Sequence, residues 1–201
     1  DEEVSRGLGD VYKRQLKSNS DAIHPGYGFL SENAAFANQV KKLNIKWVGP
    51  SSNAIKKMGD KLTAKEIAIK VNVPTLPMTS DPKKANSIGY PILVKAAAGG
   101  GGKGMRIVEK AKDLKESIKA AEREAEGGFG DKRVFLERYI KRSRHIEIQI
   151  LGDAFGNIVH LGERECSIQR RHQKIVEESP SPMVDEEMRE KMGEAAIKLA
   201  S

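Results

Sequence analysis

The sequence predicts a fold of mixed α/β and α+β structure, and three observations support this prediction. Short apolar segments alternate with amphipathic segments over the first third of the chain, which indicates a parallel α/β layer. A run of four glycines at residues 99–102 separates two β-rich segments. Three further strand-like segments follow one another between residues 133 and 164.

Residues 1–15 have no clear apolar period, and we expect them to be non-native or disordered. Strand and helix signals alternate in the segment that follows. The expected elements are a strand end that breaks into a glycine turn over residues 22–29, a helix capped by Ser31 and ending at about Lys42, a strand at residues 45–48, a helix capped by Ser51 or Ser52 and ending at Met58, and a helix from residue 60 to about 71.

The remaining elements surround the glycine run. They are a connector at residues 74–86, hairpin arms at 90–94 and 105–108, a helix at 110–126 stopped by Gly127 and Gly128, strands at 133–140, 144–151 and 157–164, and a helix at 185–201. In the strand at residues 144–151, three isoleucines alternate with polar residues, so the isoleucines should face a core. The polar side suits a wet cleft, and a solvated sheet face is the alternative.

The composition fits a globular protein. The chain has 201 residues, 38% of them hydrophobic, and no apolar run approaches the roughly 20 residues that span a bilayer, so we expect no membrane partner. The charges that give a net +7 are interspersed and aromatics are only 5%, so nucleic acid is not an expected partner either. The single cysteine and the absence of a visible leader lead us to expect the cytoplasm.

The glycine-rich segment at residues 95–105 favours anion binding. Its glycines leave backbone N–H groups free to surround an anion, and Lys95 and Lys103 add charge at both ends. We interpret it as a cover for a nucleotide triphosphate, with a flexible surface hairpin as the alternative. Because Lys103 precedes neither Ser nor Thr and no helix follows, the Walker pattern and the dinucleotide fingerprint do not apply.

Five motifs occur in order along most of the chain. They are residues 24–33 (His-Pro-Gly-Tyr-Gly-Phe-Leu-Ser-Glu-Asn), 58–61 (Met-Gly-Asp-Lys), 95–105, 144–149 (Arg-His-Ile-Glu-Ile-Gln) and 163–174 (Glu-Arg-Glu-Cys-Ser-Ile-Gln-Arg-Arg-His-Gln-Lys). Together they resemble the biotin carboxylase family, and most closely the biotin carboxylase subunits of acetyl-CoA and propionyl-CoA type acyl-CoA carboxylases. The ordered set is far more specific than any one motif.

The resemblance implies a partial ATP-grasp fold preceded by the end of a Rossmann-like pre-ATP-grasp domain. Residues 16–59 would close that first domain, and residues 60–201 would begin the ATP-grasp domain, with a glycine-rich lid at about 76–139. The implied reaction is the ATP-dependent carboxylation of biotin, in which bicarbonate attacks ATP to give carboxyphosphate. Implied partners are ATP, bicarbonate, a biotin carboxyl carrier domain and a carboxyltransferase. The intact parent protein would be a homodimer.

By the same resemblance, Lys61 and Lys95 would contact the ATP phosphates, and Lys174 would hold bicarbonate or carboxyphosphate as the catalytic candidate. Residues 137–140 would lie beside adenine. The full set expected to bind ATP is Lys61, Lys95, Gly100, Gly101, Gly102, Met105, Glu137, Arg138, Tyr139, Ile140, His145, Gln169 and His172. If the last motif is extended, His172 and Lys174 share one strand face.

Several of these residues have a plainer interpretation. Lys61 could be a solvated residue in the first turn of a helix, although a cation there opposes the helix dipole. Glu147 could form a surface ion pair with Arg144 or Arg164. Cys166 invites a thiol mechanism, but we favour a packed side chain, because phosphoryl transfer needs no thiolate.

The sequence departs from the family at both ends. Much of the first domain is absent before Leu16, and the family's Mg²⁺-binding glutamates and the groups that activate bicarbonate and biotin would lie beyond Ser201. We therefore expect no metal ligand in this chain and no activity from it alone. Two alternatives stay open: a truncated ATP-binding module without turnover, and another ATP-grasp ligase similar to carbamoyl-phosphate synthetase.

Overall fold

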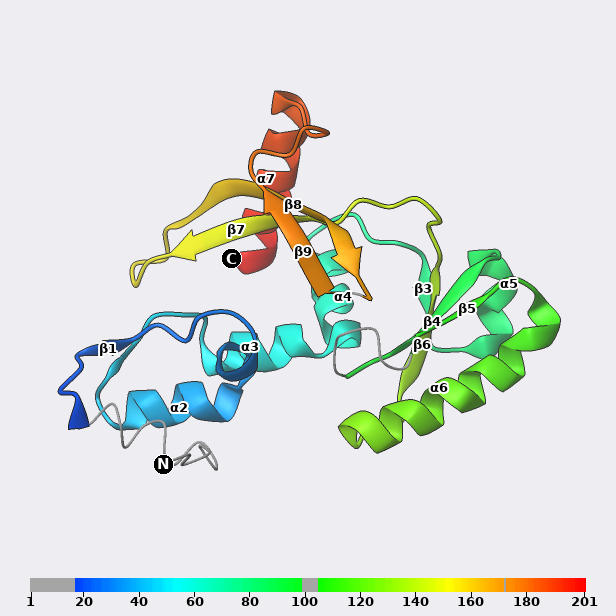
Figure 1. Cartoon of the computed structure of the whole chain (residues 1–201), viewed down its shortest axis with the longest axis horizontal. Coiled ribbons are helices and arrows are strands. Elements are labelled where there is room, and N and C mark those ends of the chain that lie inside the picture. Colours follow the sequence, from blue (N-terminus) through cyan, green and yellow to red (C-terminus); the bar gives the residue numbers. More distant parts are fainter. Residues whose placement is uncertain (1–16, 99–104, 172) are drawn as a thin grey trace. The chain divides into compact units, whose positions relative to one another are not determined.

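The computed structural model describes residues 17–98, 105–171 and 173–201 (Figure 1). Contacts divide the chain into two units, one ending at Asp60 and the other beginning at Lys61. Over the three described ranges, no helix combines the length and the apolar character needed to cross a membrane.

The first unit is a small α/β layer. Its elements are β1 (Ala22–Ile23), η1 (Phe29–Glu32), α2 (Ala34–Lys42), β2 (Lys46–Trp47) and α3 (Ser52–Gly59). The two strands pair in parallel, as the strand–helix alternation predicted. Phe36 and Val40 on α2 pack with Ile23 and Ile45 to form the core. The Trp47 ring lies edge-on to Phe36, with 5.6 Å between ring centroids.

The helix caps of this unit were predicted only in part. Ser51 caps α3 by accepting a hydrogen bond from the Ala54 N–H at 3.1 Å, as expected. The expected cap of α2 is wrong, because Ser31 lies in the 3₁₀ turn η1. Asn33 caps α2 instead, and its side chain accepts a hydrogen bond from the Phe36 N–H at 2.9 Å.

The second unit begins with a four-stranded antiparallel sheet in the order β3-β6-β4-β5. Strands β4 and β5 are the arms of the predicted glycine hairpin. Helix α6 lies beside this sheet (Figure 1), and its residues Leu114 and Ala121 belong to the same buried cluster as Ile92, Val94 and Leu136. The elements are α4 (Lys61–Lys70), β3 (Met78–Thr79), η2 (Pro82–Lys84), α5 (Ala85–Ile88), β4 (Ile92–Ala96), β5 (Arg106–Val108), η3 (Ala111–Asp113), α6 (Leu114–Phe129) and β6 (Val134–Arg138).

A three-stranded antiparallel sheet completes the unit, in the order β7-β8-β9. Its strands are β7 (Ile146–Gly152), β8 (Ile158–Arg170) and β9 (Gln173–Glu178), and α7 (Glu186–Ala200) packs on β7 and β8 (Figure 1). Met188, in the first turn of this helix, is 50% exposed.

A β-bulge interrupts the pairing of β7 with β8. Ile150 pairs with His160, whereas Ile148 pairs with Glu163, so β8 carries one extra residue between these two pairs. Gly162 lies in the extra segment and has a φ of +84°, which favours glycine. As a result, His160 and Glu163 lie on the same side of the sheet as the isoleucines of β7.

Three further boundaries differ from the predictions. Helix α6 continues through Gly127 and Gly128 to Phe129, and Gly130 ends it in the left-handed conformation. The predicted connector contains β3, and β8 extends six residues past the predicted end at residue 164. Strand β9 was not predicted. It pairs with β8 through backbone hydrogen bonds, and local sequence patterns do not reveal such pairing.

Candidate functional site

Three lysines surround one glutamate beside the start of α4, and we call Lys61, Lys65, Lys95 and Glu137 the lysine cluster. The Glu137 side chain is only 5% exposed and accepts hydrogen bonds from the ammonium groups of Lys65 and Lys95. Lys61 Nζ donates to the backbone carbonyl of Ala96 at 3.1 Å. Two positions expected to bind phosphate, Lys61 and Lys95, thus lie in one group.

The electrostatics of the lysine cluster favour an anion. Burial lowers the pKa of Lys61, the positive charge of Lys95 lowers it further, and Glu137 opposes the change. Burial alone would raise the pKa of Glu137, but the hydrogen bonds from Lys65 and Lys95 outweigh it and the pKa is lowered. Two ammonium groups donate to the one carboxylate and that of Lys61 interacts with it through charge, so the four side chains together carry a net positive charge.

The segment expected beside adenine, residues 137–140, begins at the end of β6. The Arg138 guanidinium donates to the Tyr90 carbonyl at 3.1 Å, and the Tyr139 N–H donates to the Pro91 carbonyl at 3.1 Å. Ile140 is 42% exposed and Met105 is half-buried. These contacts tie the segment to the start of β4, and the Glu137 side chain contacts lysines rather than being free to reach a base.

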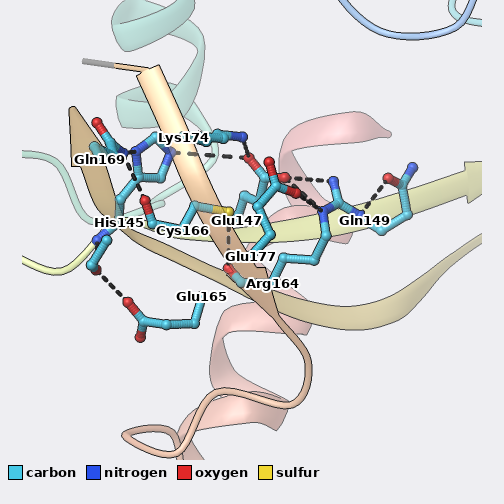
Figure 2. A network of polar contacts seen from close by, with 10 residues as sticks. His145, Glu147, Gln149, Arg164, Glu165, Cys166, Gln169, Lys174 and Glu177 are labelled. Carbon is cyan, nitrogen blue, oxygen red and sulfur yellow. Dashed lines mark hydrogen bonds and ion pairs between the residues drawn. The ribbon is translucent and has the colours of Figure 1, made fainter. Parts of the chain in front are cut away.

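A second group of polar and charged side chains lies on the side of β7 and β8 opposite α7, and we call Glu147, Gln149, Arg164 and Lys174 the Glu147 network. Glu147 Oε2 accepts from Lys174 Nζ at 2.5 Å, and Oε1 accepts from Arg164 Nε at 2.7 Å. Arg164 Nη1 also donates to Gln149 Oε1 at 3.0 Å. Figure 2 shows Lys174 and Arg164 both reaching the Glu147 carboxylate.

The Glu147 network keeps Lys174 protonated. The hydrogen bond from Lys174 to Glu147 raises the pKa of the lysine, although partial burial opposes the change. Burial would raise the pKa of Glu147, but the hydrogen bonds from Lys174 and Arg164 prevail and lower it. The alternative pairing of Glu147 with Arg164 is therefore correct, and Lys174 is a further partner that this interpretation did not include.

His145 and Gln169 form a contacting pair beside this network (Figure 2). Gln169 Nε2 lies 2.8 Å from His145 Nδ1 and 2.8 Å from the Cys166 carbonyl oxygen. His145 Nε2 lies 4.0 Å from a carboxylate oxygen of Glu147. The pair therefore lies at the edge of the Glu147 network.

Cys166 is buried and is not set up as a nucleophile. Burial raises the pKa of its thiol, and the nearby Glu147 carboxylate raises it further, so the thiolate is disfavoured. Ligand atoms of Glu147, Cys166 and Glu177 lie within 4.8 Å of one another. A protonated thiol is not a ligand for Mg²⁺, which prefers oxygen, so these residues do not form a magnesium site.

The structure thus brings Lys61, Lys95 and Glu137 together in the lysine cluster, and Lys174, His145 and Gln169 in or beside the Glu147 network. Met105 and residues 138–140 belong to neither group. The candidates Gly100, Gly101, Gly102 and His172 lie outside the described residues, as does the expected shared face of His172 and Lys174. Sequence reasoning missed Lys65, although its spacing of four residues from Lys61 was a signal that both lie on one helix face.

Comparisons with known proteins identify the family. Residues 60–201 match the family model described as the ATP-binding domain of the carbamoyl-phosphate synthase L chain, and residues 8–55 match the biotin carboxylase N-terminal domain. The chain belongs to the biotin carboxylase family. It is 51% identical to a biotin carboxylase of Nostoc over 96% of this chain and 45% of the relative, and 50% identical to biotin carboxylase 1 of Bacillus subtilis over 91% of this chain and 42% of the relative.

Solved structures of biotin carboxylases support the fold. A biotin carboxylase–β,γ-ATP complex from Campylobacter jejuni superposes with a TM-score of 0.89 at 47% identity, covering 96% of this chain and 45% of that one. The biotin carboxylase domain of a Hydrogenobacter thermophilus 2-oxoglutarate carboxylase, a dimer with MgADP, ADP and bicarbonate, gives 0.87 at 43% identity, covering 96% and 44%. The ATP-grasp prediction is therefore confirmed. The chain spans less than half the length of these relatives.

Proposed function

We propose that this chain supplies part of the ATP site of a biotin carboxylase, an enzyme that uses ATP and bicarbonate to carboxylate biotin on a carrier protein. The lysine cluster carries the proposal, because it combines a net positive charge with the base of the glycine hairpin. The chain is similar in sequence and fold to biotin carboxylases crystallised with nucleotides, which supports a nucleotide as the ligand.

In this proposal Lys61 and Lys95 bind the ATP phosphates, and the backbone at residues 100–102 covers them. A bicarbonate oxygen attacks the γ-phosphorus, ADP leaves, and carboxyphosphate forms. The ureido nitrogen of biotin then attacks the carboxyl carbon, the C–O bond to phosphate breaks, and the inorganic phosphate that leaves takes up the proton of the nitrogen. Charge neutralisation by fixed cations is the main demand of the first step.

Lys174 would hold the bicarbonate or carboxyphosphate anion. Its raised pKa supports a cationic role, because an ammonium group that keeps its proton can neutralise an anion but cannot act as a base. His145 and Gln169 would contact the nucleotide from the edge of the Glu147 network. Met105 and residues 137–140 would surround the adenine.

The whole protein would work with a biotin carboxyl carrier domain and a carboxyltransferase, as a homodimer in the cytoplasm. Residues 16–59 would belong to its first domain and residues 60–201 to its ATP-grasp domain. The Hydrogenobacter relative was crystallised as a dimer with MgADP. Mg²⁺ would supply further charge to the phosphates when bound, from ligands outside this chain.

Calorimetric titration of the chain with ATP and ADP tests the nucleotide site. We expect saturable binding that Lys95→Met weakens by about 10- to 100-fold, through loss of one charge-assisted contact to phosphate. Lys112→Met, in the exposed turn η3, is the matched control and should leave binding unchanged. Equal binding by the Lys95→Met variant and the wild type would contradict the proposal.

An ATP-binding domain also occurs in carbamoyl-phosphate synthases, as the description of the matched family states, so that activity is the second candidate. Phosphate release by the whole protein separates the two. Stimulation by biotin with bicarbonate supports the carboxylase, whereas stimulation by an ammonia donor with bicarbonate supports the synthase. The chain alone should hydrolyse no ATP in response to bicarbonate; hydrolysis would show that it is catalytically complete.

A further inference from the structure

Glu165 is a buried carboxylate that no catalytic step uses. It is 4% exposed and lies on the α7 side of β8. One oxygen accepts from the Ser181 hydroxyl at 2.9 Å, and the other accepts from the Ser167 hydroxyl. Arg144 Nη1 lies 3.8 Å away. Two hydroxyl donors and a guanidinium thus hold this carboxylate in one position.

The contacts continue from Glu165 to His145. The Ser167 hydroxyl oxygen accepts a hydrogen bond from the His145 backbone N–H at 2.8 Å. Because its proton is already donated to Glu165, this hydroxyl is oriented to accept. Glu165 and Ser167 therefore fix the backbone at residue 145, immediately before β7 begins.

The His145 ring is fixed at its other end. The Gln169 amide nitrogen has two protons, one for the Cys166 carbonyl and one for His145 Nδ1, each at 2.8 Å. Since an amide nitrogen only donates, His145 Nδ1 accepts, and the neutral ring carries its proton on Nε2. That nitrogen faces Glu147 at 4.0 Å.

We propose that Glu165 and Ser167 are positioning residues that hold the His145–Gln169 pair in its place for nucleotide binding. Neighbouring Glu163 binds Arg189 of α7 instead. One buried carboxylate of β8 thus holds α7, and the other holds the backbone at His145 through Ser167. The nucleotide part of this inference rests on the proposed function. The positioning part does not.

The first test needs no nucleotide. In ¹H–¹⁵N spectra of the chain, the Gln169 side-chain amide should be displaced from the position of a free glutamine. Ser167→Ala and Glu165→Gln should return this resonance toward that position. The His145 backbone N–H loses its oriented acceptor, and only the hydrogen bond from the Cys166 N–H to the His145 carbonyl still holds this backbone. Ser181→Ala is the control. It removes the other hydroxyl that donates to Glu165 but keeps Ser167, so the Gln169 resonance should stay unchanged. An unchanged Gln169 resonance in folded Ser167→Ala protein overturns the inference.

A double-mutant cycle on ADP binding gives the second test. Ser167→Ala should weaken ADP binding about tenfold in the wild-type background and have no effect in a His145→Ala background, because it acts through His145. Equal losses in both backgrounds overturn the inference and indicate a general structural role. If the wild-type chain binds no ADP, the proposed function fails, and the spectra still decide whether Glu165 and Ser167 position His145.

Discussion

The Glu163–Arg189 pair is expected to be the main polar anchor of α7 on its sheet. Arg189 Nε and Nη2 each donate to the Glu163 carboxylate at 2.8 Å, and the Ser181 N–H adds a third hydrogen bond at 3.1 Å. These contacts lower the pKa of Glu163 from 4.5 to about 2, the hydrogen bond from Arg189 being the largest cause. The perturbation that tests this anchor is Glu163→Gln.

The size of the effect follows from the pKa. A pKa lowered from 4.5 to about 2 corresponds to about 3 kcal/mol in favour of the charged form. The Arg189 side chain is 24% exposed, so solvent screening reduces our expectation to about 2 kcal/mol. Because the folded-state pKa is the lower one, this stability is fully present above pH 4.5 and is lost as the pH falls toward 2.

Amide hydrogen exchange in α7 is the appropriate assay, because it reports local opening of this helix. At pH 7 the α7 amides of the Glu163→Gln variant should exchange about 30-fold faster than those of the wild type, the rate ratio for about 2 kcal/mol. After correction for intrinsic rates, the ratio should shrink between pH 4.5 and pH 3.

Glu187→Gln makes the same chemical change on an exposed residue of α7 and is the control, expected to have little effect. Unchanged α7 protection in Glu163→Gln at pH 7 would refute the reasoning. So would a wild-type-to-variant ratio that stays constant down to pH 3, since the ion pair would then not be its source.

Three other variants test packing and charge. Gly193→Ala should lower the free energy of unfolding by about 1–3 kcal/mol in urea followed by far-UV circular dichroism, because the added Cβ would lie 2.5 Å from His160 Nε2; wild-type stability would contradict that contact. Lys65→Met should cost about 1–3 kcal/mol by the same measurement, since buried Glu137 loses a charged partner, whereas a neutral result would mean that Lys95 suffices. Cys166→Ala should retain ADP binding in calorimetry, and the native wild-type thiol should react with a maleimide far more slowly than in urea; rapid native labelling would show that the thiol is accessible.

Local sequence patterns predicted much of the fold. Glycines flanked by apolar residues predicted the β4–β5 hairpin, because turn chemistry and strand propensity act over a few residues. Leu114 and Ala121 are seven residues apart, a spacing that places both on one face of a helix, and both side chains are buried in the structure. Lys61 and Lys95 were selected by motif resemblance, and the structure brings both to Glu137, one by hydrogen bond and one by charge.

The partners of buried charges could not be predicted. Glu163 meets Arg189 across 26 residues, and nothing in either local sequence indicates the other. The sequence showed Ser167 only as one residue of a charged motif, and it did not indicate that the hydroxyl lies between Glu165 and the His145 N–H. Such pairs depend on the register of strands and the packing of α7, which are long-range properties.

The bulge at Gly162 shifts the inward–outward alternation of β8 by one residue. Odd-numbered residues of a regular strand share one side, so Leu161 and Glu163 would be expected to face the same way. The inserted residue changes this parity, and Leu161 is 62% exposed while Glu163 is 2% exposed. Deletion of Gly162 would remove the extra residue and leave each following side chain on its present side. A regular strand that kept Gly162 in its alternation would instead turn every following side chain of β8 over. The carboxylates that hold α7 and His145 would then exchange places with Arg164 and Cys166, so this single glycine sets which side of the strand faces the helix.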